Sequence, residues 1–386
     1  MAVNGGAPAG LGAAEVPGAV ADPGGVSYPG AATATEGSAV PRAAPAARLS
    51  AVVPTVGRSA LLAACLEALR RDGGRELEIV VVDQAPSPLA LPAGLADRVL
   101  RPGRNLGFAA AANRGISAAR GELVAVVNDD LLIEPGWLAA LSGALAGRPD
   151  AAAAQGVNLL LAAPALADGW GLAWNRWWQA VQLGHGEEAP PPLAPMREVF
   201  GVSATAALYR RSALAEVARG GWKGGAWRGG AESGESEGDE LRGTPSLFDP
   251  PFFDPRLESY YEDVELAGRL RAAGWRALAV PRARARHAGS ASFGALPRAR
   301  WRLVYGNRYL AAARLLGGGF WRRLPRMAAR DALDLARAAA AGEGARVAGI
   351  LAGWLRALRL LPAFARRGAP AVREDAAAGA FVNLPS

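Results

Sequence analysis

The sequence predicts an α/β fold with a mostly parallel central sheet flanked by helices, followed by a C-terminal helical extension. Short apolar runs typical of buried strands alternate with segments in which apolar residues have helical spacing. This alternation is typical of βαβ units, whose strands are parallel. From residue 297 onward the pattern is helical and rich in Arg, which predicts the extension.

The predicted strands are short and apolar. They cover residues 49–53, 77–82, 99–100, 123–127, 202–209 and 277–280. The predicted helices cover residues 59–70, 109–119, 135–145, 211–218 and 262–273. Ligands bind at the carboxyl ends of parallel strands, so the polar residues that close these strands are the first candidates for a site.

Composition divides the 386 residues into four parts. Residues 1–47 form an Ala-, Gly- and Pro-rich leader, which we expect to be disordered because it has few large apolar side chains to bury. Residues 48–296 form the α/β domain, with a Gly-, Glu- and Ser-rich insertion at 220–244 that we also expect to be disordered. The Arg-rich helical extension covers residues 297–368, and a flexible tail covers 369–386.

Charge and cysteine content exclude several kinds of site. The single cysteine, Cys65, excludes an internal disulfide and a thiolate metal cluster, and its helical spacing with leucines predicts a buried position. The net charge of +8 is concentrated in residues 297–368, which hold 15 Arg and 3 acidic residues. We find neither a run of 18 uncharged apolar residues nor a secretory signal pattern, and therefore expect a cytoplasmic protein without a transmembrane helix.

Polar residues close two of the predicted strands. Asp83 follows one of them, where it could accept the imide N–H of a uracil or thymine base or cap the segment that follows. Asn128, Asp129 and Asp130 follow another. Their oxygens suit a hard divalent cation that also binds a diphosphate, although acids here could equally cap the helix near Pro135.

A carboxylate pair and a histidine complete the candidates. Glu262 and Asp263 open a predicted helix, where acids complement the helix dipole and where a carboxylate can also act as a general base toward an acceptor hydroxyl. His287 is one of two histidines and follows a predicted strand. A neutral imidazole is a good ligand for a divalent ion, and a purely structural role is the alternative.

Five segments carry a family resemblance. They are LSAVVPTVGRSALLAACLEAL, EIVVVDQA, RNLGFAAAANRGISAARGELVAVVNDDLLIEPGWLAAL, FGVSATAALYRRSAL and FDPRLESYYEDVELAGRLRAAGWRALAVPRARARHAGSAS. In this order they resemble the family 2 glycosyltransferases of the GT-A fold, and most closely their bacterial rhamnosyltransferase-like members. The resemblance covers residues 49–314 apart from the insertion, and the third and fifth segments are the specific ones.

The resemblance implies an inverting transfer of a sugar from a UDP- or dTDP-sugar to a hydroxyl of a glycan or lipid-linked acceptor, in cell-envelope polysaccharide synthesis. Asp263 would be the catalytic base, and Asp130 and His287 would hold Mg²⁺ or Mn²⁺. Glu262 and Trp170 would lie on the acceptor side. The nucleotide-sugar site would comprise Pro54, Thr55, Asp83, Asn105, Gly107, Phe108, Asn113, Asn128, Asp129 and Asp130.

The sequence departs from the family pattern at three places. Asn128 occupies the first position of the DXD-type metal motif, and Gln84 and Ala85 replace the usual Asn and Ser after Asp83. The second acid after the base is Glu265 rather than Asp. None of these departures removes a group that the implied chemistry requires.

Other functions remain open at this point. A sugar-nucleotidyltransferase would have a similar fold, but the basic Gly-rich loop that it usually needs after its first strand is missing.

Arg residues interleaved with Trp, Phe and Leu in the extension predict peripheral contact with an anionic membrane at the inner face of the plasma membrane, or else a helical cap with a solvated Arg face. Charge alone would suit a non-catalytic membrane- or nucleic-acid-binding protein. That interpretation leaves Asp83, Asp130, Asp263 and His287 unexplained, so we expect no nucleic-acid partner.

Overall fold

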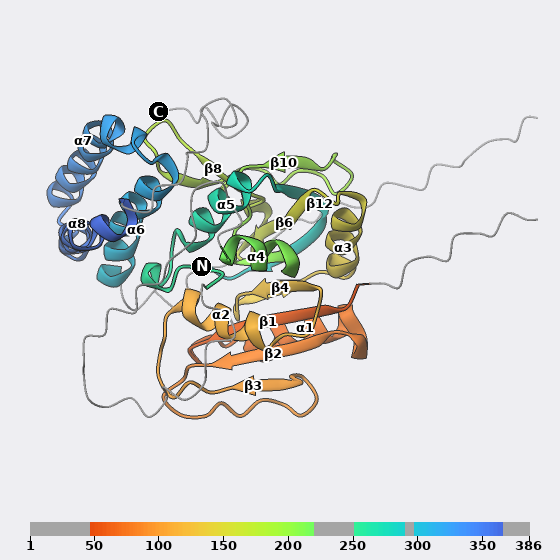
Figure 1. Cartoon of the computed structure of the whole chain (residues 1–386). Coiled ribbons are helices and arrows are strands. Elements are labelled where there is room, and N and C mark those ends of the chain that lie inside the picture. Colours follow the sequence, from red (N-terminus) through yellow and green to blue (C-terminus); the bar gives the residue numbers. More distant parts are fainter. Residues whose placement is uncertain (1–46, 220–250, 290–296, 366–386) are drawn as a thin grey trace, which may run out of the picture. The chain divides into compact units, whose positions relative to one another are not determined.

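The computed structural model describes residues 47–219, 251–289 and 297–365. The predicted leader (except residue 47), insertion and tail lie outside these residues. The described chain is built around one large sheet with the strand order β10-β12-β6-β11-β4-β1-β2-β3, in which β5 also pairs with β12 and β7 with β6 (Figure 1). Helices cover both faces of this sheet.

The first half of the sheet is parallel, as predicted. It consists of β1 (Leu49–Thr55), β2 (Glu78–Asp83), β3 (Arg98–Leu100) and β4 (Leu123–Val127). Successive side chains of β1 point to opposite faces of the sheet: Val52 packs in the core on one face and Val53 in the core on the other. This double burial explains why these strands are continuous apolar runs.

The second half of the sheet is mixed, so the expectation of a mostly parallel sheet is wrong there. β11 (Ala206–Arg210) runs antiparallel to β4 and to β6 (Ala151–Leu160), whereas β6 is parallel to β12 (Arg276–His287). Antiparallel neighbours need no helical crossover, so strand–helix alternation does not reveal them. The remaining strands are β5 (Leu131–Ile133), β7 (Ala163–Gly169), β10 (Arg197–Val199) and a separate hairpin of β8 (Leu172–Trp174) with β9 (Ala180–Gln182).

Two layers of helices enclose the sheet. One core contains residues of α1 (Leu62–Gly73) and α3 (Trp137–Gly147), and Cys65 is buried there as predicted. The other core contains residues of α2 (Phe108–Ala118), α4 (Arg211–Ala218) and α5 (Glu262–Ala272). α2 lies so close to β1 that a Cβ at Gly115 would be 2.2 Å from a methyl carbon of Val52. Two short 3₁₀ turns, Gly74–Glu76 and Pro255–Leu257, complete the described elements.

Three long helices form the C-terminal region, which confirms the predicted helical extension. They are α6 (Pro297–Leu316), α7 (Gly319–Ala340) and α8 (Gly344–Ala365) (Figure 1). α6 packs against α5, where a Cβ at Gly268 would lie 2.0 Å from Leu315. α6 also crosses α8 closely at Gly306 and Gly353. Among the described helices, α8 is the one long and apolar enough to cross a membrane by length and composition, and 33% of its apolar window is buried.

Candidate active site

The carboxyl ends of β1, β2 and β4 bring predicted site residues to one edge of the sheet. Thr55 is in register with Asp83 across β1 and β2. The Thr55 hydroxyl donates a hydrogen bond to Asp129 Oδ2 over 2.5 Å, which ties the turn after β4 to the end of β1. Pro54, the residue before Thr55, is buried within β1.

Asp129 holds the turn after β4. Its main-chain oxygen accepts a hydrogen bond from the Ser59 hydroxyl over 2.9 Å. Burial raises the pKa of Asp129 to about 6; the charge of Asp130 adds to this rise, and the Thr55 hydroxyl opposes it. Asn128 donates its main-chain N–H to Thr205 O over 2.8 Å. The Asp130 side chain lies beside His287.

Asp130 and His287 meet because of strand register. β5 begins at Leu131 and pairs antiparallel with the end of β12, which places Leu131 opposite His287. The N–H of Ala288 donates to the main-chain oxygen of Asp130 over 3.0 Å. In this arrangement His287 Nε2 lies 3.2 Å from Asp130 Oδ1.

Asp168, which no sequence pattern singled out, holds the other side of the His287 ring. Asp168 Oδ2 lies 2.9 Å from His287 Nδ1. The second histidine of the chain, His185, is exposed and also contacts Asp168, with 3.3 Å between its Nδ1 and Asp168 Oδ1. Burial lowers the pKa of His287, but the hydrogen bonds and charges of Asp130 and Asp168 outweigh burial and raise it to about 9.

The pair of Asp130 and His287 fits a divalent ion. His287 Nε2 is buried and faces a carboxylate oxygen, Asp130 Oδ1, 3.2 Å away. A nitrogen and an oxygen that converge in this way suit Mg²⁺ or Mn²⁺. The described residues contain no group of three or more such ligands. A bound ion would therefore take its remaining ligands from diphosphate oxygens and water.

The Asp83 carboxylate is engaged by its own loop. It is 2% exposed and accepts hydrogen bonds from the N–H groups of Ala85 and Leu89, each over 3.0 Å. Arg101 Nε lies 3.2 Å from Asp83 Oδ2. These contacts match the capping alternative, and the contact between Asp83 and a pyrimidine base stays a prediction.

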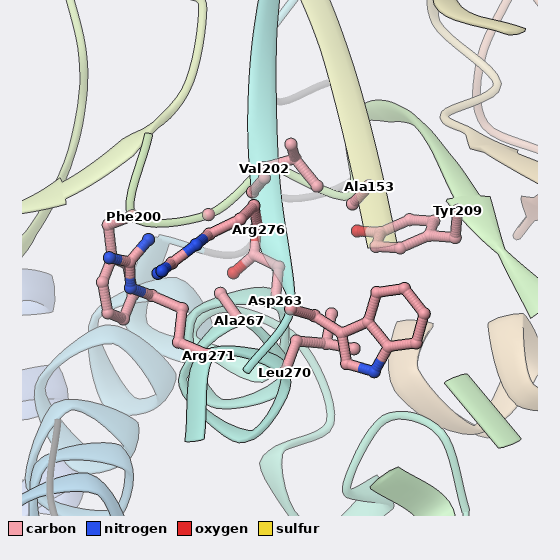
Figure 2. A pocket seen from close by; sticks show the side chains of 12 residues that line it. Ala153, Phe200, Val202, Tyr209, Asp263, Ala267, Leu270, Arg271 and Arg276 are labelled. Carbon is pink, nitrogen blue, oxygen red and sulfur yellow. The ribbon is translucent and has the colours of Figure 1, made fainter. Parts of the chain in front are cut away.

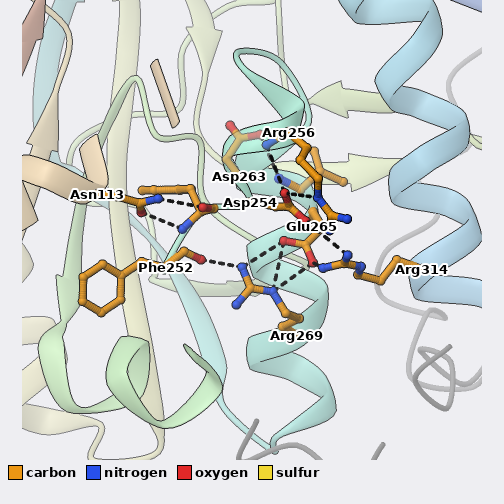
Figure 3. A network of polar contacts seen from close by, with 10 residues as sticks. Asn113, Phe252, Asp254, Arg256, Asp263, Glu265, Arg269 and Arg314 are labelled. Carbon is orange, nitrogen blue, oxygen red and sulfur yellow. Dashed lines mark hydrogen bonds and ion pairs between the residues drawn. The ribbon is translucent and has the colours of Figure 1, made fainter. Parts of the chain in front are cut away.

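The predicted nucleotide-binding loop and helix contact a second loop. Asn105 Oδ1 accepts the N–H of Gly107, which has a φ of +81°. The Phe108 ring packs edge-on against Phe253. The side-chain amide of Asn113 makes two hydrogen bonds of 2.8 Å with the backbone of Phe253 (Figure 3): Nδ2 donates to Phe253 O, and Oδ1 accepts the N–H of Phe253. Asn113 therefore joins α2 to the segment that leads into α5.

The predicted catalytic base lies at the start of α5. Asp263 Oδ2 accepts the N–H of Ala204 over 3.2 Å, and Asp263 Oδ1 accepts the N–H of Val264 over 2.8 Å. The backbone of Thr205, next to Ala204, contacts Asn128, so residues 204 and 205 connect the end of β4 to Asp263. Burial raises the pKa of the Asp263 carboxyl, and the backbone hydrogen bonds oppose this rise.

Glu262 lies next to Asp263 in a more deeply buried position. Its Oε2 has no hydrogen-bond partner among the described residues. Burial and the neighbouring charge of Asp263 raise the pKa of Glu262 well above its ordinary value. Trp170, the other residue predicted for the acceptor side, is half-buried and donates its main-chain N–H to Leu183 O. The acceptor-side roles of both residues stay predictions.

A small pocket adjoins Asp263 between α5 and the sheet. It is lined by residues of α5, β6 and β11 and by the start of β12, including Tyr209 and Arg271 (Figure 2). The pocket does not include Thr55, Asp83, Asp130 or His287. It therefore lies apart from the strand ends that bear the candidate donor site, and Asp263 is the only predicted site residue that lines it.

Residues 50–218 match the family model described as glycosyl transferase family 2. These residues include β1, β2, β4 and the Asn128–Asp130 group, but neither Asp263 nor His287. No curated protein matches the chain.

Solved structures of transferases resemble the chain at low identity. GalNAc-T7 with UDP, GalNAc and Mn²⁺ has 14% identity and a TM-score of 0.44, over 69% of this chain and 50% of that one. The mannosyltransferase PcManGT from Pyrobaculum calidifontis with GDP-Man and Mn²⁺ has 17% identity and a TM-score of 0.44, over 81% and 87%. S. aureus TarS has 14% identity and a TM-score of 0.40, over 69% and 39%. The chain thus spans about half the length of GalNAc-T7.

The family-model match and the observed sheet agree with each other. The matched residues contain the parallel strands and the crossover helices around the candidate donor site, as the resemblance implied. The fold is the GT-A fold, a mixed α/β sheet with flanking helices and a C-terminal helical region. Residues 50–218 carry the glycosyl transferase family 2 match within it.

Proposed function

We propose that this protein is a metal-dependent glycosyltransferase that moves a sugar from a UDP- or dTDP-sugar to an acceptor hydroxyl with inversion at the anomeric carbon. One observation carries this proposal. Asp130 and His287 are 157 positions apart in the printed sequence, yet Asp130 Oδ1 and His287 Nε2 lie 3.2 Å apart at the sheet edge where nucleotides bind in α/β folds. The family-model match over residues 50–218 supports the same class of reaction.

In the proposed reaction Asp263 is the general base. Its carboxylate takes the proton of the acceptor hydroxyl, and the acceptor oxygen forms a bond to the anomeric carbon. The bond between that carbon and the diphosphate oxygen breaks, and the electron pair leaves with the nucleoside diphosphate. The N–H groups of Ala204 and Val264 fix the direction of the Asp263 carboxylate.

Asp130 and His287 would hold the divalent ion. When bound, the ion would stabilise the negative charge that develops on the departing diphosphate. Asp168 would keep the Nδ1 side of His287 occupied, so that Nε2 faces the ion. Thr55 and Asp129 hold the turn that presents Asp130.

A donor screen tests this proposal. Thermal unfolding is measured with UDP, dTDP and GDP, each with and without Mn²⁺, and transfer is then assayed with sugars of the nucleotide that binds. We expect a metal-dependent rise in Tm with UDP or dTDP, and Asp263→Asn should lose transfer while keeping that rise. If no nucleotide shifts the Tm of the wild-type protein, the donor site is absent and the proposal is wrong.

The finer assignments rest on the sequence resemblance. We propose rhamnose as the sugar and a glycan or lipid-linked acceptor of cell-envelope polysaccharide synthesis as the substrate class. We further propose a cytoplasmic location at the inner face of the plasma membrane. A transfer assay with dTDP-rhamnose against UDP-hexoses tests the sugar, and a preference for a UDP-hexose would reject the rhamnosyl assignment.

Peripheral membrane contact would use the outer surface of α7 and α8. Leu355 and Leu358 on α8 are 70% and 68% exposed, and Leu351 is exposed on the same helix. Arg326 on α7 and Arg359 on α8 are exposed on the same pair of helices. Exposed leucines combined with arginines suit an anionic lipid surface, where the leucines insert among the acyl chains and the arginines contact headgroups.

Sedimentation with liposomes tests the membrane contact. We expect binding to vesicles that contain anionic lipid at low salt, weaker binding at high salt, and loss of binding in the double variant Leu355→Gln, Leu358→Gln. The matched control is Leu193→Gln, which is 85% exposed and lies outside the helical extension. Absence of binding at low salt would leave the helices as a cap on the catalytic domain.

A further inference from the structure

The backbone immediately before Glu262 and Asp263 is strained. Glu258, Tyr260 and Tyr261 have positive φ angles of 59°, 65° and 70°. This left-handed region is unfavourable for residues with a Cβ, and bulky residues occupy it only when the surrounding structure compels them. Trp178 is the only other described non-glycine residue with a positive φ. The strain is therefore concentrated in the four residues that lead into α5.

Asn307 of α6, which follows this strained segment in the sequence, binds the segment through its side chain. It is fully buried, and its Nδ2 donates to three main-chain oxygens: Leu257 O over 2.6 Å, Ser259 O over 2.9 Å and Tyr260 O over 2.8 Å. An amide nitrogen carries only two hydrogens, so the three oxygens share them. The left-handed turns make these carbonyls converge on one point, and Asn307 occupies that point.

Two arginines of the extension hold the first residue of the segment. Glu258 lies 2.9 Å from Arg302 of α6 and 3.0 Å from Arg356 of α8. Arg356 also donates to the main-chain oxygen of Arg256. Both α6 and α8 thus bind the loop through arginine side chains, in addition to the amide of Asn307.

On its other side the segment contacts the helix that bears predicted donor-binding residues. The N–H of Ala109 donates to Glu258 O over 2.8 Å. A Cβ at Gly107 would lie 3.3 Å from the backbone of Glu258, and the φ of Gly107 is +81°, so both the close approach and the backbone conformation favour glycine. Residues 257–261 therefore lie between the donor-binding helix α2, the extension and the catalytic carboxylate.

We propose that Asn307 is a positioning residue for the catalytic base: by binding three carbonyls of residues 257–260, it maintains the strained loop that places Asp263 at the start of α5. The C-terminal helices are then a structural part of the active site and not a separate appendage. This inference rests on the proposed role of Asp263 as the base. It adds a role for a residue of α6 that lies outside the family-model match.

The variants Asn307→Asp and Asn307→Ala test the proposal, because each removes the donor amide. We expect kcat to fall by about 100-fold while the KM for the donor and the UDP-dependent rise in Tm stay near wild type, since a displacement of about 1 Å can cost this much in rate. Hydrogen exchange of residues 257–264 should become faster. The matched control is Tyr309→Phe in α6, the helix of Asn307, which removes a buried hydrogen bond to Asp331 of α7 and leaves the amide of Asn307 in place.

Three outcomes decide the proposal. Loss of kcat with faster exchange in both Asn307 variants, and neither effect in the control, supports it. Unchanged kcat, or unchanged exchange of residues 257–264, overturns it. If the Asn307 variants do not fold, Glu258→Gln tests the same loop through the half-exposed ion pairs and should lower kcat by about 10-fold; an unaltered kcat there also rejects the proposal. If Asp263→Asn shows that Asp263 is not the base, the hydrogen exchange of residues 257–264 still tests whether Asn307 maintains the loop.

Discussion

Arg314 of α6 lies 2.9 Å from Glu265 of α5, and both side chains are almost completely buried. Glu265 also binds Arg269 of its own helix, and Arg314 lies 3.1 Å from Asp254 (Figure 3). The guanidinium of Arg314 lies over the ring of Phe364 in α8, 4.5 Å from its centroid. This network joins α5 to the C-terminal helices through charges that are almost completely buried.

We predict that Arg314→Met destabilises the protein by about 3 kcal/mol, because it removes a buried cation and leaves the carboxylates of Glu265 and Asp254 with one arginine partner each. The control is Arg330→Met, which removes a more exposed ion pair with Asp334 and should cost no more than about 1 kcal/mol. Urea unfolding at pH 7 measures both values. If the two variants lose the same free energy of unfolding, the buried Arg314 network is no more stabilising than the more exposed ion pair of Arg330.

A second prediction concerns the free energy needed to ionise the buried carboxyl groups of Glu262 and Asp263. Burial raises the pKa values of Glu262 and Asp263, so each group stabilises the fold below its ordinary pKa, and this contribution is lost as pH rises through the raised value. At pH 7 to 8 a neutral amide avoids the cost of ionisation. We therefore expect Glu262→Gln to raise Tm by roughly 2–4 °C, the shift that about 1 kcal/mol produces in a chain of this size.

The size of that rise should depend on pH. Calorimetry at pH 5 and pH 8 should show the larger benefit of Glu262→Gln at pH 8. A variant that is less stable than wild type at both values would mean that the Glu262 carboxylate is stabilising, contrary to its buried and unpartnered Oε2.

The pH dependence of turnover follows from the same environment. A general base acts when deprotonated, and the pKa of Asp263 is raised from its ordinary value of 3.8 by burial. We expect kcat/KM to fall with decreasing pH at values clearly above 3.8. Glu262→Gln should leave this acid limb in place, because the pKa of Glu262 is raised further and Gln resembles its protonated form. A rate that stays constant down to pH 4 would contradict the role of Asp263.

The sequence predicted much of the fold, and the structure brings together Asp130 and His287, whose metal-binding role stays a prediction. β1, β2 and β4 are apolar runs buried on both faces, so their pattern is local and visible. β6 was missed because its Ala-rich start has no strand periodicity, and its pairing with β11 and β12 decides its conformation. β12 continues to His287 beyond the predicted end at Val280, because alternating Arg and Ala residues extend the strand.

Residues with distant partners could not be predicted. Asp168 meets His287 across 119 positions, and Asn307 meets the loop before α5 across about 50. Neither residue stands in a local pattern that distinguishes it from any other Asp or Asn. Their roles arise from the register of β12 with its neighbours and from the packing of α6 on α5, which only the assembled structure determines.

Asp168 should control metal affinity without touching the ion. Partners that orient a metal-binding histidine typically contribute about 10- to 100-fold to affinity, so we predict a weakening of this size in Mn²⁺ binding for Asp168→Asn. Binding is measured by electron paramagnetic resonance of free Mn²⁺ in the presence of UDP. The control is His185→Gln, which alters the exposed contact of Asp168 and should leave the affinity within about 3-fold. Equal effects of the two variants would reject the orienting role.

The crossing of α6 and α8 depends on two glycines that face each other. A Cβ at Gly353 would lie 2.9 Å from Gly306 N and from Arg302 O, which are backbone atoms that cannot move aside independently. We therefore expect Gly353→Ala to force the helices apart and to destabilise the protein by about 1–3 kcal/mol, as overpacking does elsewhere. The control is Gly143→Ala in α3, where no atom lies within 4 Å of the added Cβ and helix propensity predicts a gain of up to about 1 kcal/mol. Arg302 also binds Glu258, so Gly353→Ala should lower kcat as well. If the variant loses stability but keeps its kcat, the helix crossing does not influence the loop before α5.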